Sequence, residues 1–442
     1  MKFKKLISSL LGSILLSGPM VMHAQQASSA GSVDSLSLPQ ILDKVLATYP
    51  TVMKAREAIQ AAEAGIGLAR SGYYPNINAN VGYTRIDPVP EITIPDMGSF
   101  SMMPNNNYNA SVSVYQTIYD FEKTARNVQL QESTKTLTEE NVGLVRQRLT
   151  LLTSVSYYTL IYLQEAIRIK DSQIATLQEH LDYVTLKEQT GSSTQYEVLS
   201  TQVRLSNAEN QRVDLEASRQ TQLAVLNSLM GLPVTTPLVV KSNFITSNPN
   251  VPPDSLINYA LEHRYEMTMA RLKEEHAQLE LRSVKAMTNP TLGVFLTGGV
   301  KNGYFPELNQ PKANLAAGVT LTVPIFDATR KHNTILLANS QINMARTEID
   351  QTTRDVSTEV YQNEMNLQAS VKKIDQGVLQ VQQAQQALDL AQVSYQTGAI
   401  TNLDLLDAET ALAESRVNLL RARTEYAINL VRLSISVGQP IQ

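Results

Sequence analysis

The chain has 442 residues, and its 37 Lys and Arg against 41 Asp and Glu give a formal net charge of -4. This slightly acidic balance argues against nucleic acid as a partner, because nucleic-acid-binding proteins carry clustered positive charge. There is no cysteine, which excludes disulfide bonds and thiolate chemistry from the fold and the function.

Residues 1–24 have the three parts of a secretory signal peptide. Lys2, Lys4 and Lys5 give a positive start, the apolar stretch LISSLLGSILL follows, and a small-residue exit site ends at Ala24. We expect cleavage after Ala24, so that the mature chain begins at Gln25 and is exported.

The rest of the chain contains one pattern written twice. Ile-Tyr-Asp at 118–120 returns as Ile-Phe-Asp at 325–327, an offset of 207 that also relates Thr190-Gly191 to Thr397-Gly398. Upstream the offset is 215, so the first copy holds an eight-residue insertion, which is typical of a surface loop. We therefore divide the chain into a first repeat at 25–233, a linker at 234–253 and a second repeat at 254–442.

Heptad spacing predicts long helices in both repeats. Apolar residues recur every seven positions on either side of a four-residue slip, which separates Val356 from Val360 in the second copy. Heptads favour left-handed supercoiling and such a slip unwinds it locally. The pattern predicts three helices in each repeat: 40–72, 120–189 and 195–231, then 254–287, 327–396 and 402–438. The long helices would measure about 100 Å at about 1.5 Å per residue.

Between the helices the period changes from helical to two. Ile77, Ala79, Val81 and Tyr83 alternate with polar or small residues, and the same alternation follows at 108–115 and at 313–322. We therefore expect strands at about 75–86, 107–117, 291–300 and 312–323. Strands of about ten residues with one apolar face are typical of transmembrane β-barrels. A hairpin of a soluble protein with one buried face is the alternative interpretation.

The number of strands has a consequence for assembly. Four strands per chain are too few to close a barrel in lipid, because single-chain outer-membrane barrels begin at about eight strands. Several copies must then contribute to one barrel, and three copies give twelve strands. The expected fold is mainly α with a transmembrane β part.

At this point the sequence resembles the TolC-type outer-membrane efflux family over nearly the whole mature chain. The most specific segment runs from Tyr395 to Leu433, where Tyr is followed after three residues by Gly, then by Asp404 and Asp407 and a helix rich in Ala and Arg. The resemblance implies duplicated long α-hairpins that form a trimeric α-helical barrel, topped by a 12-stranded β-barrel with four strands per protomer. It also implies a location in the cell outer membrane, with the helical tunnel in the periplasm.

The resemblance further implies partners and a passive role. Members serve as exit ducts of tripartite efflux pumps, so the expected partners are a homotrimer, a periplasmic adaptor protein, an inner-membrane pump and outer-membrane lipid. The two hairpin turns are expected to face the adaptor, with docking residues Gly191, Ser192, Thr194, Gly398, Ala399 and Thr401. Cargo is left open among drugs, metals, small molecules and polypeptides.

The periplasmic entrance carries the remaining candidate site. In the family an acidic pair lines this entrance, and it corresponds here to Asp404 and Asp407. The lock of the family uses a tyrosine, an arginine and acidic partners; Tyr395 and Glu197 match two of these, but Ile400 stands in place of the arginine. Thr401 with Asp404 and Thr194 with Glu197 also have capping-box spacing. Helix capping for Asp404 and heptad packing for Tyr395 therefore stay open as alternatives.

The sequence offers no support for catalysis. The five histidines show no i, i+4 pair, no phosphate-binding glycine loop is present, and neither a metal site nor a cofactor is expected. Two alternatives to an efflux duct remain: a duct for type I polypeptide secretion and an exported soluble coiled-coil scaffold. The scaffold would leave the alternating strands unexplained.

Overall fold

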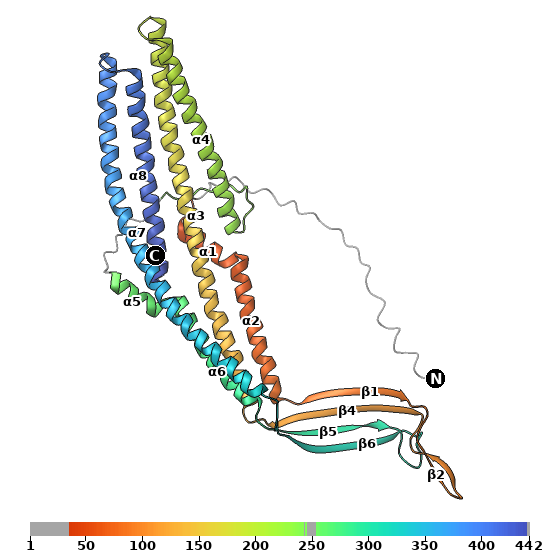
Figure 1. The fold of residues 1–442 in the computed structure, drawn as a ribbon. Helices are drawn as coiled ribbons and strands as arrows, with labels where there is room; N and C mark the ends of the chain where they lie inside the picture. The colour runs from red at the N-terminus through yellow and green to blue at the C-terminus, as the bar shows by residue number, and fades with distance from the viewer. Residues whose placement is uncertain (1–34, 243, 245–252, 440–442) are drawn as a thin grey trace, which may run out of the picture.

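The computed structural model describes residues 35–242, 244 and 253–439, so the expected signal peptide at 1–24 and part of the expected linker lie outside it. A long bundle of helices continues at one end into a single sheet of long strands (Figure 1). No helix in these residues is both long enough and apolar enough to cross a membrane.

Two long helical hairpins dominate the bundle and reach away from the sheet (Figure 1). Each pairs a helix of 67 residues with a returning helix of about half that length. Their bounds are α3 Lys123–Gln189 with α4 Gln195–Leu229, and α7 Arg330–Gln396 with α8 Asn402–Val437. Shorter helices continue the bundle toward the sheet beside α3 and α7.

The helices expected at 40–72 and 254–287 are each two helices instead of one. The observed pairs are α1 Leu38–Thr48 with α2 Pro50–Arg70, followed by a short 3-10 turn at Ser71–Tyr73, and α5 Pro253–His263 with α6 Tyr265–Met287. Each break is one extended residue, Tyr49 or Arg264, at equivalent positions of the two repeats. In the first repeat Pro50 explains the break, because a residue before proline avoids the helical conformation.

The heptad positions form the core of the bundle on both sides of the slip. Val356 and Val360, which flank the slip in α7, are both buried, and so are Leu149 and Leu160 in α3. One apolar cluster joins α1, α3 and the ends of α4 and α8, and a second joins α5, α6, α7 and α8. The duplicated pattern therefore packs as two similar half-bundles.

The repeated Ile-Tyr-Asp and Ile-Phe-Asp segments mark the starts of the two long helices. Asp120 accepts a hydrogen bond from the backbone N–H of Thr124 at 2.8 Å, and Asp327 accepts one from the N–H of Lys331 at 2.9 Å. A carboxylate at this position satisfies backbone donors that the first helical turn leaves free. The repeat in the sequence is therefore a repeated helix cap.

The sheet has four antiparallel strands in the order β1-β4-β5-β6, with β1 and β6 at its edges. Their bounds are β1 Asn76–Arg85, β4 Asn106–Tyr119, β5 Thr291–Lys301 and β6 Lys312–Thr322. The expected loop between β1 and β4 contains a further small hairpin, β2 Glu91–Ile94 with β3 Gly98–Ser101.

The strand register places most of the apolar residues of all four strands on one face. Val81 lies opposite Ala110, Ala110 opposite Val300, and Val300 opposite Ala313, while the neighbouring Asn80 lies opposite Ser111. Because side chains alternate along a strand, the two faces differ along the whole sheet. Nothing within residues 35–242, 244 and 253–439 covers the apolar face, and Val81 is 86% exposed there.

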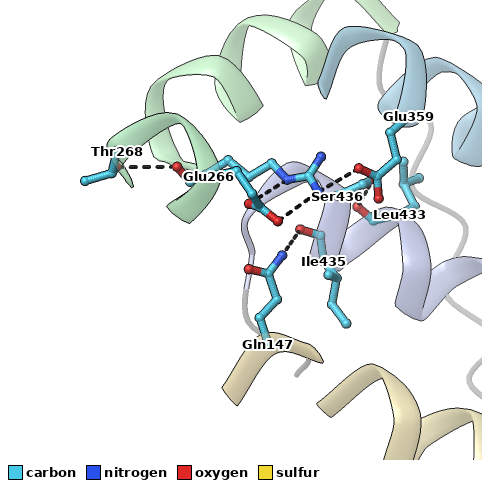
Figure 2. Close-up of polar contacts among 8 residues, drawn as sticks. Gln147, Glu266, Thr268, Glu359, Leu433, Ile435 and Ser436 are labelled. Carbon is cyan, nitrogen blue, oxygen red and sulfur yellow. Dashed lines mark hydrogen bonds and ion pairs between the residues drawn. The ribbon is translucent and has the colours of Figure 1, made fainter. Parts of the chain in front are cut away.

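Arg264 fixes the break between α5 and α6. Its side chain is 6% exposed, and its guanidinium lies 3.0 Å from Glu266 Oε2 and 2.6 Å from Glu359 Oε2. Figure 2 shows both carboxylates beside the last turn of α8, where the side chain of Gln147 donates to the carbonyl of Ile435. A cation near a helix C-terminus is also favoured by the helix dipole.

We predict that Arg264→Leu lowers the stability of the second repeat. The substitution removes a buried cation and leaves two carboxylates near each other, at a cost of about 2–4 kcal/mol. Thermal unfolding followed by helical circular dichroism in detergent measures the loss. The matched control is Arg168→Leu, whose Arg–Glu pair lies on the surface with the arginine 71% exposed, so it should cost below about 1 kcal/mol. Equal losses would contradict a structural role for Arg264.

Candidate functional site: the tips of the two helical hairpins

Both hairpin turns have the same glycine-based geometry. Gly191 and Gly398 adopt left-handed conformations with φ of 77° and 75°. The N–H of Ser192 donates to the carbonyl of Lys187 at 2.8 Å, and Ala399 makes the equivalent bond at the same length in the second turn. These are Schellman motifs, in which a residue with positive φ closes the end of a helix. The tips are therefore fixed by their own backbone hydrogen bonds.

The returning helices begin with threonine caps that differ in one respect. The hydroxyl of Thr401 accepts from the N–H of Asp404 at 3.2 Å, and the Asp404 carboxylate accepts from the N–H of Thr401 at 2.8 Å, which completes a capping box. Thr194 accepts from the N–H of Glu197 at 3.3 Å, but the Glu197 carboxylate accepts from the hydroxyl of Ser193 instead. Asp404 is thus part of a helix cap, while the Glu197 carboxylate bonds the Ser193 hydroxyl and does not complete a capping box.

The charge of Asp404 is stabilised by its cap. The hydrogen bond from the Thr401 hydroxyl, together with that from the Thr401 N–H, lowers the pKa of Asp404 below its usual value. The side chain is on the surface at the very end of the bundle, so its carboxylate is ionised at neutral pH and open to solvent.

Asp407, one turn further along α8, connects the two hairpins. Its Oδ1 lies 2.7 Å from Nη2 of Arg204 on α4, and the two side chains are 59% and 35% exposed. An ion pair with this exposure contributes little to stability. Its effect is to hold one positive and one negative charge together at the tip. The sequence pattern did not identify Arg204.

Tyr395 connects the hairpins through its hydroxyl. The ring is buried, and its Oη donates to Oε2 of Glu197 at 3.2 Å. Burial, reinforced by the charge of Glu197, raises the pKa of Tyr395 well above its usual value, so the phenol stays a donor. The residue both continues the heptad core of α7 and bonds an acid of the other hairpin, so packing and hydrogen bonding occur together.

A histidine and an asparagine extend this contact into the interior. Nε2 of His180 lies 2.5 Å from Oδ1 of Asn402, whose amide nitrogen lies 3.3 Å from the hydroxyls of Ser200 and Thr201. Burial lowers the pKa of His180, so the ring is neutral at neutral pH. The position of His180 between the buried Leu177 and Val184 in the sequence indicates its burial, but nothing there indicates its partner.

We use the name tip network for these six side chains, which join the two hairpins of one chain: His180, Glu197, Arg204, Tyr395, Asn402 and Asp407. Ile400, at the position where the family resemblance implies an arginine, is half-buried against the apolar cluster that includes Leu388 and Leu405. Cations near the tip therefore come from α4, as Arg204, and from the last turn of α3, where Nζ of Lys187 lies 5.1 Å from the centre of the Tyr395 ring. Over the described parts of the chain, no cluster of three or more His, Cys, Asp or Glu is arranged to hold a metal.

Comparisons of the sequence agree with the observed duplication. The family model described as outer membrane efflux protein matches residues 41–232 and 256–439, one segment in each repeat. The chain is 24% identical over 427 residues to Outer membrane protein TolC of Escherichia coli strain K12, which covers 91% of this chain and 82% of that protein. It is also 24% identical over 340 residues to Alkaline protease secretion protein AprF of Pseudomonas aeruginosa, covering 75% of this chain and 70% of that protein.

Solved structures show the same fold. The CmeC outer membrane channel of Campylobacter jejuni superposes with a TM-score of 0.78 at 16% identity, covering 91% of this chain and 85% of that one. The outer membrane protein VceC of Vibrio cholerae gives a TM-score of 0.76 at 18% identity, covering 91% and 96%. The expected fold class, long helical hairpins with antiparallel strands, is confirmed. Because one family model matches both repeats, the chain belongs to the outer membrane efflux protein family, as an outer-membrane channel protein and not an enzyme.

Proposed function

We propose that three copies of this chain assemble into one outer-membrane duct, in which their sheets close into a barrel of twelve strands. The observation that carries this proposal is the four-stranded sheet with an uncovered apolar face and two open edges. The strands have the length and the alternation of lipid-facing barrel strands. Joining β6 of one copy to β1 of the next would pair the backbone groups of both edges, which a bilayer requires.

The orientation of the barrel wall follows from the two faces of the sheet. The apolar face, with Val81, Val112 and Leu315, would contact lipid, and the opposite face, with Asn80, Ser111 and Asn314, would line the pore. Each copy contributes its helical bundle below the barrel, so three bundles around the same axis would continue the pore as a helical tunnel.

The hairpin tips are the proposed contact with the rest of the pump. They are the parts of the helices farthest from the sheet (Figure 1), so a bundle that hangs from the outer membrane presents its turns toward the inner membrane. The turn residues proposed to dock onto a periplasmic adaptor, above an inner-membrane pump, are Gly191, Ser192, Thr194, Gly398, Ala399 and Thr401. Rigid Schellman turns suit such a role, because docking them costs little conformational entropy.

The tip network and the capping residue Asp404 are proposed to form the periplasmic entrance of the duct. Threefold symmetry would place three copies of Asp404 and three of Asp407 around one axis, and such rings of carboxylates favour cations. Tyr395 and Glu197 hold the two hairpins of one copy together behind them. Ile400 supplies no charge, and Arg204 compensates the charge of Asp407.

The proposed duct could export either of two kinds of cargo. Export of small molecules is the first, and the similarity to AprF, whose name is that of a protease secretion protein, favours polypeptide secretion as the second candidate. A deletion strain distinguishes them: drug sensitivity with an unchanged set of secreted proteins supports efflux, and loss of a secreted protein supports secretion.

We predict that the two faces of β1 respond in opposite ways to a charge. Val81→Lys places a cation in lipid at a cost of about 2–4 kcal/mol if it lies near the bilayer midplane, so it should reduce the heat-sensitive trimer in outer-membrane fractions. The neighbouring Asn80→Lys faces the pore and should leave the amount of trimer near the wild-type level. Both can be measured on gels with and without heating. Equal tolerance of the two lysines would contradict the barrel.

At the entrance we predict opposite effects from the two partners of one ion pair. Asp407→Asn leaves Arg204 uncompensated and should lower the cation-to-anion permeability ratio, whereas Arg204→Gln should raise it. Reversal potentials in planar bilayers with a salt gradient measure both ratios. Neutralising the Arg212 and Asp171 pair, which joins α4 to α3 within the first hairpin and lies away from the tips, is the control and should change neither ratio. Shifts of the same sign in the two single variants would refute the proposed entrance.

A further inference from the structure

Two aromatic side chains interrupt the polar face of the sheet. Tyr115 of β4 and Phe295 of β5 are register partners, so they lie at the same level. They share a face with Ser113 and Thr297, two residues away on the same strands, whose hydroxyls lie 3.2 Å apart. Most other residues of this face are small or polar, so the two rings stand out as its large aromatic groups.

Both rings lie on glycines of the next strand. A Cβ atom added at Gly293 would lie 2.7 Å from Cζ of Tyr115, and one added at Gly318 would lie 2.6 Å from Cε1 of Phe295. Real Cβ atoms do not approach other atoms so closely, so only glycine leaves room for each ring. The rings therefore lie over the backbone of the neighbouring strand, Tyr115 over β5 and Phe295 over β6.

This arrangement leaves one side of each ring open. Tyr115 is 43% exposed and Phe295 is 37% exposed, although each ring contacts a strand on its inner side. A ring perpendicular to the sheet would expose mainly its edge to the space above the polar face. A ring that lies over the neighbouring strand exposes its π-face to that space. Exposed π-faces attract planar aromatic groups by stacking and cations through the ring quadrupole.

We propose that Tyr115 and Phe295 form a binding ring for planar aromatic cations on the inner wall of the barrel. The inference rests on the proposed closure of three sheets, which would bring six such rings to one level of the pore. The level lies toward the helical end of the sheet, because Tyr115 is opposite Asn76, the first residue of β1. Cargo leaving the helical tunnel would meet these rings early in its passage through the barrel.

The test measures block of the pore by ethidium, a planar aromatic cation, in planar bilayers containing the full-length protein. Tetrabutylammonium, a cation without a planar ring, is the reference blocker. Ethidium should block the wild-type pore at lower concentration than tetrabutylammonium does. Tyr115→Leu combined with Phe295→Leu keeps apolar bulk but removes the π-faces, so the blocking concentration of ethidium should rise about fivefold or more, with that of tetrabutylammonium unchanged.

Three further variants serve as controls. Tyr115→Phe keeps the ring and should keep the ethidium block, while Tyr83→Leu removes an aromatic ring from the opposite face and should not change it. Should the double variant fail to assemble, Tyr115→Leu and Phe295→Leu alone should each show part of the loss. A conducting pore whose ethidium block is the same in the leucine variants would overturn the binding ring while leaving the duct intact. Absence of any conducting pore in the wild-type protein would overturn both.

Discussion

The structure depends on one constraint: a sheet of four strands can neither pair the backbone groups of its two edge strands nor bury its apolar face. Among the residues that the structure describes, nothing pairs with the outer edges of β1 and β6, and nothing covers the apolar face that holds Val81 and Leu315. In water such a sheet is an aggregation hazard, and in lipid its open edges cost several kcal/mol per unpaired group. Closure with further copies removes both problems. The proposed assembly, the membrane location and the transport pore therefore depend on one another.

The helices answer a different requirement, which is length. Each 67-residue helix packs along its returning helix near the tips and along two shorter helices nearer the sheet. One extended residue, Tyr49 or Arg264, separates the two shorter helices of each repeat. Duplication supplies two nearly equivalent half-bundles, but the tip network is not symmetric. Asn402 bonds His180 in the interior, while the equivalent position in the first repeat, Gln195, is exposed. The repeats thus share a scaffold and differ where they meet each other.

Much of the fold could be predicted because the spacing of apolar residues along the sequence is regular within each helix and strand. The seven-residue period that contains Val360 and the alternation around Val81 determine which face of each element is apolar, and both are visible without coordinates. The breaks at Tyr49 and at Arg264 were both missed. Pro50 marks the first break, but no proline marks the second, which a buried ion pair of Arg264 with Glu359, 95 residues away, stabilises instead. The tip network was found only in part for the same reason. Arg204 and Asp407 are 203 residues apart in the sequence, and no local pattern joins them.

The central claim is that β1 of one copy pairs with β6 of another, and cysteine cross-linking tests it most directly because the chain has no cysteine of its own. One cysteine replaces Ala79 on β1, and a second replaces Leu315, Ala317 or Val319 on β6 in turn. Within one chain these edges are three strand spacings apart, about 14 Å, which is beyond the reach of a disulfide. The account predicts that oxidation in outer-membrane fractions links chains into covalent dimers and trimers for at least one pair. A protein that stays monomeric for every pair, and soluble without detergent, would contradict it.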